Sequence, residues 1–122
     1  MLTTGVDIVE IGRVQQVLER WGQRFLDRIF TEGEQAYCAG RAPNLAARFA
    51  AKEATMKALG TGVRGVSWKD IEVVRQESGA PSLRLTGRAL QRFQSLGLSH
   101  LALSLSHSRD NAVAMVVGQS EP

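Results

Sequence analysis

The feature that most constrains the fold is a helical segment in the middle of the sequence that ends at Gly60. Its large apolar residues recur at helical spacing and predict one buried face: Leu45, Phe49, Met56 and Leu59. The neighbouring stripe carries small residues, Ala46 and Ala50, which leave room for another element to approach, followed by Glu53 and Lys57.

Glu53 and Lys57 lie one turn apart, so a carboxylate and an ammonium group face the same space. Gly60-Thr61-Gly62 then ends the helix in backbone that can approach a ligand closely. A solvent-exposed ion pair followed by a glycine stop explains the same residues without any function.

Length and charge limit the remaining possibilities. The 122 residues, 43% hydrophobic and 22% charged, are typical of one globular domain spanning 1–122. We expect a cytoplasmic protein, because the sequence has neither a long apolar run nor a basic segment followed by an apolar one at its N-terminus. The net charge of +3 favours an anionic partner, which can be a nucleic acid, a membrane surface, a phosphorylated small molecule or an acidic protein.

Residues 2–8 alternate as a short strand, with Val6 and Ile8 on one face and Gly5 and Asp7 on the other. We therefore expect Asp7 to lie near the end of the strand and to face away from its apolar side. An Asp that directly precedes a helical pattern can also serve as a helix cap.

Residues 11–29 have a helical period that Gly22 weakens without ending. Apolar residues fall in one arc of this helix, and Arg13, Arg20 and Arg24 gather on the neighbouring arc. Such a stripe is either the solvated side of a helix or a surface for an acidic partner.

The other segments complete an α+β fold in which a short antiparallel sheet packs with a long N-terminal helix and the central helix. Thr31 and Glu34 form a capping box for a short helix, and Cys38, the only cysteine, is expected to be a small buried or half-buried hydrophobic residue. Gly40, Pro43 and Asn44 predict a loop, and the glycine-rich residues 60–65 a mobile segment. The remaining predicted elements are a hairpin at 71–75 and 82–86, a helix at 87–96, and strands at 101–108 and 112–118, with His107 half-buried.

Three motifs occur in a fixed order: Gly5 to Ile11, Arg48 to Ala54 continuing with Lys57 to Gly62, and Leu103 to Ser108. Together they resemble the holo-acyl-carrier-protein synthases, the small bacterial 4'-phosphopantetheinyl transferases, over nearly the whole chain. The resemblance implies the 4'-phosphopantetheinyl transferase fold and Mg²⁺-dependent transfer of 4'-phosphopantetheine from coenzyme A to a serine of apo-acyl carrier protein in fatty-acid biosynthesis. It also implies a homotrimer with active sites between subunits.

The resemblance assigns roles to individual residues. Asp7 and Glu53 would hold Mg²⁺, Lys57 would neutralise phosphate charge, and either Glu53 or a magnesium-bound water would accept the serine proton. Carrier protein would dock on Arg13, Arg20 and Arg24. The residues that would contact coenzyme A are Arg48, Lys57, Gly60, Thr61, Gly62, Pro81, Ser106 and His107.

Two other functions fit parts of the sequence. A basic, non-catalytic module could bind RNA or an acidic protein, but the aromatic residues form no stacking row on the predicted strands and no helix is densely basic. A nucleotide hydrolase is less favoured, because the sequence has no phosphate-binding loop. We therefore expect neither a nucleic-acid nor a membrane partner.

Overall fold

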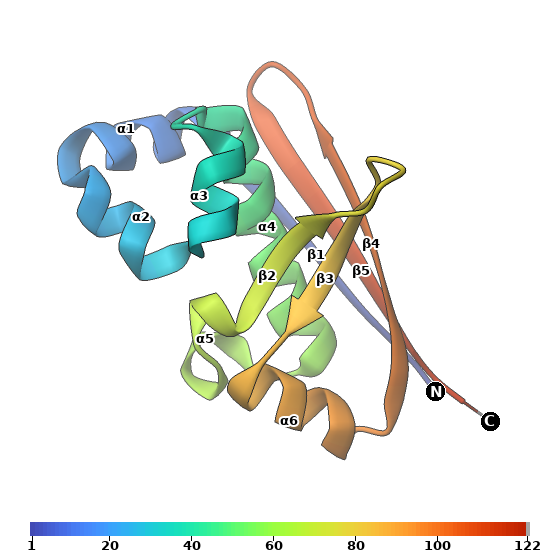
Figure 1. Ribbon diagram of the computed structural model, residues 1–122. Coiled ribbons are helices and arrows are strands. Elements are labelled where there is room, and N and C mark those ends of the chain that lie inside the picture. Colours follow the sequence, from blue (N-terminus) through green and yellow to red (C-terminus); the bar gives the residue numbers. More distant parts are fainter. Residues whose placement is uncertain (122) are drawn as a thin grey trace.

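Helix α4 (Ala42–Leu59) lies at the centre of the fold and contacts almost every other element (Figure 1). The computed structural model describes residues 1–121. A three-stranded antiparallel sheet in the order β1-β5-β4 packs on one side of α4, and a separate β2–β3 hairpin packs elsewhere on the helix. The predicted α+β class and the predicted hairpin are confirmed.

The elements follow one another along the chain with short connections. Their bounds are β1 (Leu2–Glu10), α1 (Ile11–Trp21), α2 (Gln23–Ile29), α3 (Glu32–Cys38), α4, α5 (Gly62–Gly65), a 3₁₀ turn (Trp68–Asp70), β2 (Ile71–Arg75), β3 (Pro81–Leu85), α6 (Gly87–Ser95), β4 (Leu98–His107) and β5 (Asn111–Ser120). Within residues 1–121, no helix is both long enough and apolar enough to cross a membrane.

Strand β1 lies directly against the backbone of α4, and Gly5 is the point of closest approach. A Cβ at Gly5 would lie 2.9 Å from the Ala58 amide nitrogen and closer still to the Ala54 carbonyl oxygen. The facing side of α4 carries alanines that are at most 3% exposed: Ala50, Ala51, Ala54 and Ala58. Of the two small residues predicted to admit another element, Ala50 lies on this side of α4, whereas Ala46 packs in the cluster with α1.

The alternation predicted for β1 is right, but the sequence did not indicate which face is covered. Gly5, Asp7 and Val9 face α4, whereas Val6 and Ile8 are 57% and 66% exposed. Periodicity separates the two faces of a strand without showing which one is covered. Here the face with glycine is covered, because only that face allows the helix backbone to come so close.

The predicted helix over residues 11–29 is divided at Gly22, which adopts φ 52° and ψ −127° between α1 and α2. This positive φ is accessible to glycine and redirects the chain. As a result Phe25 and Ile29 of α2 pack toward the core, while Trp21 remains 48% exposed.

Several boundaries differ from the sequence-based predictions for local reasons. The capping box at Thr31 and the left-handed helix end at Gly60 are confirmed. Helix α4 begins at Ala42 rather than Leu45, because Pro43 fits the first turn of a helix. Residues 62–65 form the short helix α5 instead of an irregular segment. His107, predicted to be half-buried, is exposed at the end of β4.

Replacing Gly5 by alanine is expected to destabilise the protein by about 3 kcal/mol or more, because the added methyl group would overlap α4 backbone. Gly12→Ala is the matched control: Gly12 lies in α1 with open space at its Cβ position, so this change should be neutral or stabilise by up to about 1 kcal/mol. Urea unfolding of both variants measures the difference. Equal stability of the two would contradict the packing described here.

Candidate active site

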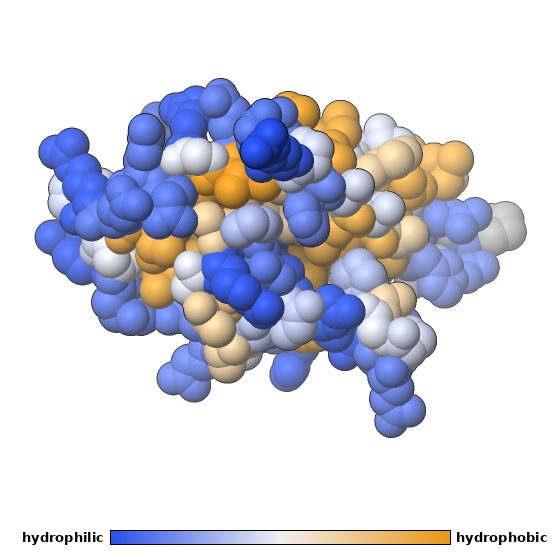
Figure 2. Space-filling model, turned by 90° about the horizontal axis from the view of Figure 1, so that it is seen from above, coloured by the Kyte–Doolittle hydropathy of each residue, from blue (hydrophilic) through white to orange (hydrophobic). Residues whose placement is uncertain are grey.

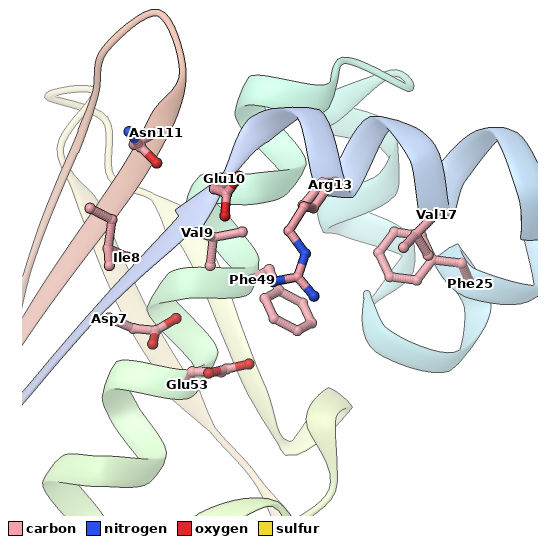
Figure 3. A pocket seen from close by; sticks show the side chains of 11 residues that line it. Asp7, Ile8, Val9, Glu10, Arg13, Val17, Phe25, Phe49, Glu53 and Asn111 are labelled. Carbon is pink, nitrogen blue, oxygen red and sulfur yellow. The ribbon is translucent and has the colours of Figure 1, made fainter.

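The packing of β1 on α4 brings together Asp7, Glu53 and Lys57. The Lys57 ammonium lies 3.2 Å from Asp7 Oδ1 and donates a hydrogen bond of 2.9 Å to the Val6 carbonyl oxygen. The Asp7 side chain is only 12% exposed, whereas that of Lys57 is 55% exposed. Figure 3 shows the Asp7 and Glu53 carboxylates extending toward one another from β1 and α4. The three side chains predicted to act together are therefore neighbours.

Without a cation between them, the Asp7 and Glu53 carboxylates repel one another. Burial raises the pKa of Glu53, the negative charge of Asp7 raises it further, and Lys57 opposes both effects. The second oxygen of Asp7, Oδ2, is buried and accepts no hydrogen bond from residues 1–121. A cation between the carboxylates would relieve both the repulsion and the unpaired acceptor.

The donor set suits Mg²⁺ better than a metal that needs a full protein cage. Among residues 1–121 there is no group of three or more His, Cys, Asp and Glu side chains that could hold a metal ion. Magnesium is commonly bound by one or two carboxylates and completes its shell with waters and phosphate oxygens. Asp7 and Glu53, with the buried free oxygen of Asp7, fit that pattern.

Asp7 and Glu53 lie at one end of a cleft of about 560 Å³ between β1, α1, α2 and α4 (Figure 3). Arg13 of α1 extends into the cleft, and Val17 and Phe25 supply apolar surface at its other end. One wall thus offers carboxylates for a cation, and the opposite wall offers a guanidinium group for an anion.

A smaller pocket of about 310 Å³ continues past the same apolar side chains to Trp21, Arg24 and Arg28. The guanidinium carbons of Arg20 and Arg24 lie 5.2 and 5.7 Å from the centroid of the Trp21 ring. Of the predicted docking residues, Arg20 and Arg24 therefore flank an exposed aromatic ring, whereas Arg13 lies in the larger cleft. The exposure of Trp21 was not predicted from the sequence, because residues 11–29 were treated as one continuous helix.

Arg48 lies in a second cluster, around the ring of Tyr37. Its guanidinium carbon is 4.2 Å from the ring centroid, and those of Arg75 and Arg41 are 4.9 and 5.7 Å away. Arg75 also donates a hydrogen bond to the Tyr37 hydroxyl group. Within residues 1–121 no carboxylate pairs with these arginines, and Nε of Arg48, a residue only 4% exposed, has no acceptor. Three guanidinium groups without a counter-charge form a candidate phosphate site.

The other residues predicted to contact coenzyme A lie in several different parts of the structure. Pro81 lies opposite Arg75 in the β2–β3 register, on the hairpin that carries the arginine cluster. Gly60, Thr61 and Gly62 follow the end of α4, one turn beyond Lys57. Ser106 and His107 are exposed at the end of β4, and neither lines the cleft. Tyr37, Arg41 and Arg75 were missed, because no spacing in the sequence relates α3 to β2.

Comparison with known proteins identifies the family. The model of the 4'-phosphopantetheinyl transferase superfamily matches residues 3–116. The chain belongs to this superfamily. Within it, the holo-[acyl-carrier-protein] synthase of Herpetosiphon aurantiacus is 52% identical over 125 residues, which cover 97% of this chain and 98% of that protein. The resemblance predicted from three motifs is therefore confirmed.

Solved structures of the superfamily share the fold. The Helicobacter pylori holo-[acyl-carrier-protein] synthase in complex with coenzyme A matches with a TM-score of 0.87 and 31% identity, over 95% of this chain and 99% of that one. The Neisseria meningitidis synthase matches with a TM-score of 0.87 and 36% identity, over 97% and 98% of the two chains. The predicted transferase fold is confirmed.

Replacing Glu53 by glutamine should stabilise the metal-free protein at neutral and alkaline pH. Because the folded state raises the pKa of Glu53, ionisation of this group costs stability as pH rises through the raised pKa. Below the ordinary value of about 4.5 the group is protonated in both folded and unfolded states, so the advantage of Glu53→Gln should vanish there. Thermal unfolding in chelator between pH 4 and pH 8 measures this dependence.

Glu77→Gln, which alters an exposed carboxylate in the β2–β3 turn, serves as the control and should show no such trend. A Glu53→Gln protein less stable than wild type at pH 8 would contradict the described environment of Glu53.

Proposed function

We propose that this protein transfers 4'-phosphopantetheine from coenzyme A to a serine hydroxyl group of apo-acyl carrier protein and releases adenosine 3',5'-bisphosphate. The observation that carries the proposal is the grouping of Asp7, Glu53 and Lys57 beside a cleft. It occurs in a chain about half identical to holo-[acyl-carrier-protein] synthases over nearly its full length. We also propose that the reaction takes place in the cytoplasm as part of fatty-acid biosynthesis.

The chemistry depends mainly on positioning and on neutralising charge, as in other phosphoryl transfers. Asp7 and Glu53 would hold Mg²⁺, which when bound neutralises charge on the pyrophosphate of coenzyme A. Lys57, exposed on the same side, can contact the pyrophosphate and give a proton to the leaving phosphate. Glu53 lines the cleft, which places its carboxylate to accept the serine proton.

The carrier protein is proposed to dock along α1 and α2. Arg13, Arg20 and Arg24 would contact an acidic partner, and Trp21 adds apolar surface beside Arg20 and Arg24. The cleft leads from this surface to Asp7 and Glu53, so a serine presented by a docked carrier can reach the site of transfer.

The arginine cluster around Tyr37 is proposed to bind a phosphate of coenzyme A. Five residues separate Arg48 from Glu53 on α4, which places their side chains about 140° apart around the helix. One subunit therefore presents its arginine cluster and its carboxylates in different directions. A single coenzyme A molecule can contact both kinds of group most directly where two subunits adjoin.

We further propose a homotrimer whose active sites lie between neighbouring subunits. The outer face of the β1-β5-β4 sheet is apolar and uncovered: Leu2, Val6, Ile8 and Met115 are between 51% and 67% exposed. Figure 2 shows its broadest hydrophobic surface on the right-hand side of the view, with smaller hydrophobic areas among the hydrophilic side chains on the left. A contiguous apolar sheet face is typical of a subunit interface. Ser106 lies on this face across Val113 from Ile8.

Incubation with apo-acyl carrier protein, coenzyme A and Mg²⁺ should increase the mass of the carrier by one phosphopantetheine, as measured by intact mass spectrometry. Chelator should abolish the increase. Asp7→Ala and Glu53→Ala should each abolish turnover while leaving the circular dichroism spectrum of the fold unchanged, because each removes a proposed metal ligand.

Near-normal activity of either variant would refute the assignment of Asp7 and Glu53 as ligands of Mg²⁺. No mass increase with several carriers, given a folded sample, would refute the transferase function. Salt-dependent RNA binding in the same sample would instead favour a basic binding module.

Met115→Lys should convert the trimer into monomers and abolish transfer, because it places a charge on the apolar sheet face outside the cleft. Leu90→Lys is the control, since Leu90 is an exposed apolar residue of α6 that lies outside the sheet. Multi-angle light scattering gives the mass of each variant. A wild-type protein that is monomeric and fully active would contradict the proposed arrangement.

A further inference from the structure

A buried ion pair joins three elements of the fold. Lys52 Nζ lies 2.8 Å from Glu34 Oε1, and both side chains are fully buried. The same ammonium group donates hydrogen bonds to the carbonyl oxygens of Trp68 and Ile71. The other carboxylate oxygen of Glu34 accepts a hydrogen bond of 2.8 Å from the amide of Val73. Helices α3 and α4 and strand β2 are therefore fixed to one another by directed polar contacts.

The residues of the arginine cluster around Tyr37 lie on the same three elements, two to four residues away from the groups that the ion pair fixes. On α3, Tyr37 follows Glu34 by three residues; on α4, Arg48 precedes Lys52 by four. Both spacings keep the side chains on one face of a helix. On β2, Arg75 follows Val73 by two residues and shares its face. The contacts of Arg48 and Arg75 with the Tyr37 ring thus require the register that the ion pair sets.

Burying the Glu34–Lys52 ion pair in the core costs free energy, because both charges lose their contact with water. Burial lowers the pKa of Lys52, an effect that Glu34 opposes. Apolar side chains of similar volume often stabilise a protein as well as or better than a buried ion pair. They pack without fixed directions, however, whereas the hydrogen bonds of Glu34 and Lys52 allow only one relative placement of α3, α4 and β2.

We propose that the Glu34–Lys52 pair is a positioning device that holds Arg48 and Arg75 against Tyr37, and so gives the protein its selectivity for an adenosine ligand carrying a 3'-phosphate. This inference rests on the proposed function for its ligand. Glu34 and Lys52 do not contact that ligand; they act through the three residues of the cluster.

The test compares the affinities of adenosine 3',5'-bisphosphate and adenosine 5'-monophosphate by isothermal titration calorimetry. Wild type should bind the bisphosphate at least tenfold more tightly, and Arg48→Met should lose most of this preference. Glu34→Leu/Lys52→Met, which replaces the pair by apolar side chains of similar size, should remain folded and lose the preference to a similar extent. Its affinity for the monophosphate should change little.

Thr55→Val is the matched control, because Thr55 is also a fully buried polar residue of α4 but hydrogen-bonds only within the helix, to Ala51. It should keep the wild-type preference even if it lowers stability. If the double variant does not fold, Glu34→Asp decides, since it keeps both charges and shortens one side chain by a methylene group. A lowered preference in Glu34→Asp supports the inference.

The positioning role would be overturned if the folded double variant, or Glu34→Asp, kept the wild-type preference for the bisphosphate over the monophosphate. If the wild-type protein showed no such preference, both the positioning role and the assignment of the cluster as a phosphate site would be overturned. Because the measurement is of binding, failure of the transfer reaction itself remains a separate result.

Discussion

The absence of a side chain at Gly5 is the constraint on which the active site depends. It allows β1 to lie against the backbone of α4 at Ala54. Asp7 follows Gly5 by two residues on the same face of the strand, and Glu53 directly precedes Ala54. The contact that packs the sheet on the helix therefore also places the two carboxylates together. A side chain at position 5 would separate them along with the two elements.

The buried and half-buried charged side chains fall into two groups, one neutralised within the protein and one not fully neutralised. Glu34 and Lys52 satisfy one another and nearby backbone groups, which fixes the core around α4. Asp7 and Glu53 repel one another and share a single Lys57, and Arg48 is buried without a carboxylate partner among residues 1–121. Charges that are neutralised only in part cost stability in the free protein and favour ligands that neutralise them. A divalent cation and a phosphate are the matching ligands for the two sites.

Local signals predicted the local features of the fold. The Thr31 capping box, the end of α4 at Gly60 and the grouping of Glu53 with Lys57 each follow from spacing within a few residues. The covered face of β1, the break at Gly22 and the burial of Arg48 could not be predicted, because each depends on which distant element packs there. For the same reason, the arginine cluster around Tyr37 could be recognised only in the structure.

The most direct test of this account is a titration of the protein with Mn²⁺ in place of Mg²⁺, in the presence of coenzyme A, followed by electron paramagnetic resonance. The account predicts one tightly bound ion per chain in wild type. It also predicts loss of that ion in Asp7→Asn and in Glu53→Gln, because both carboxylates are needed to hold it. Wild-type affinity for Mn²⁺ in either variant would contradict the claim that β1 and α4 meet to form the metal site.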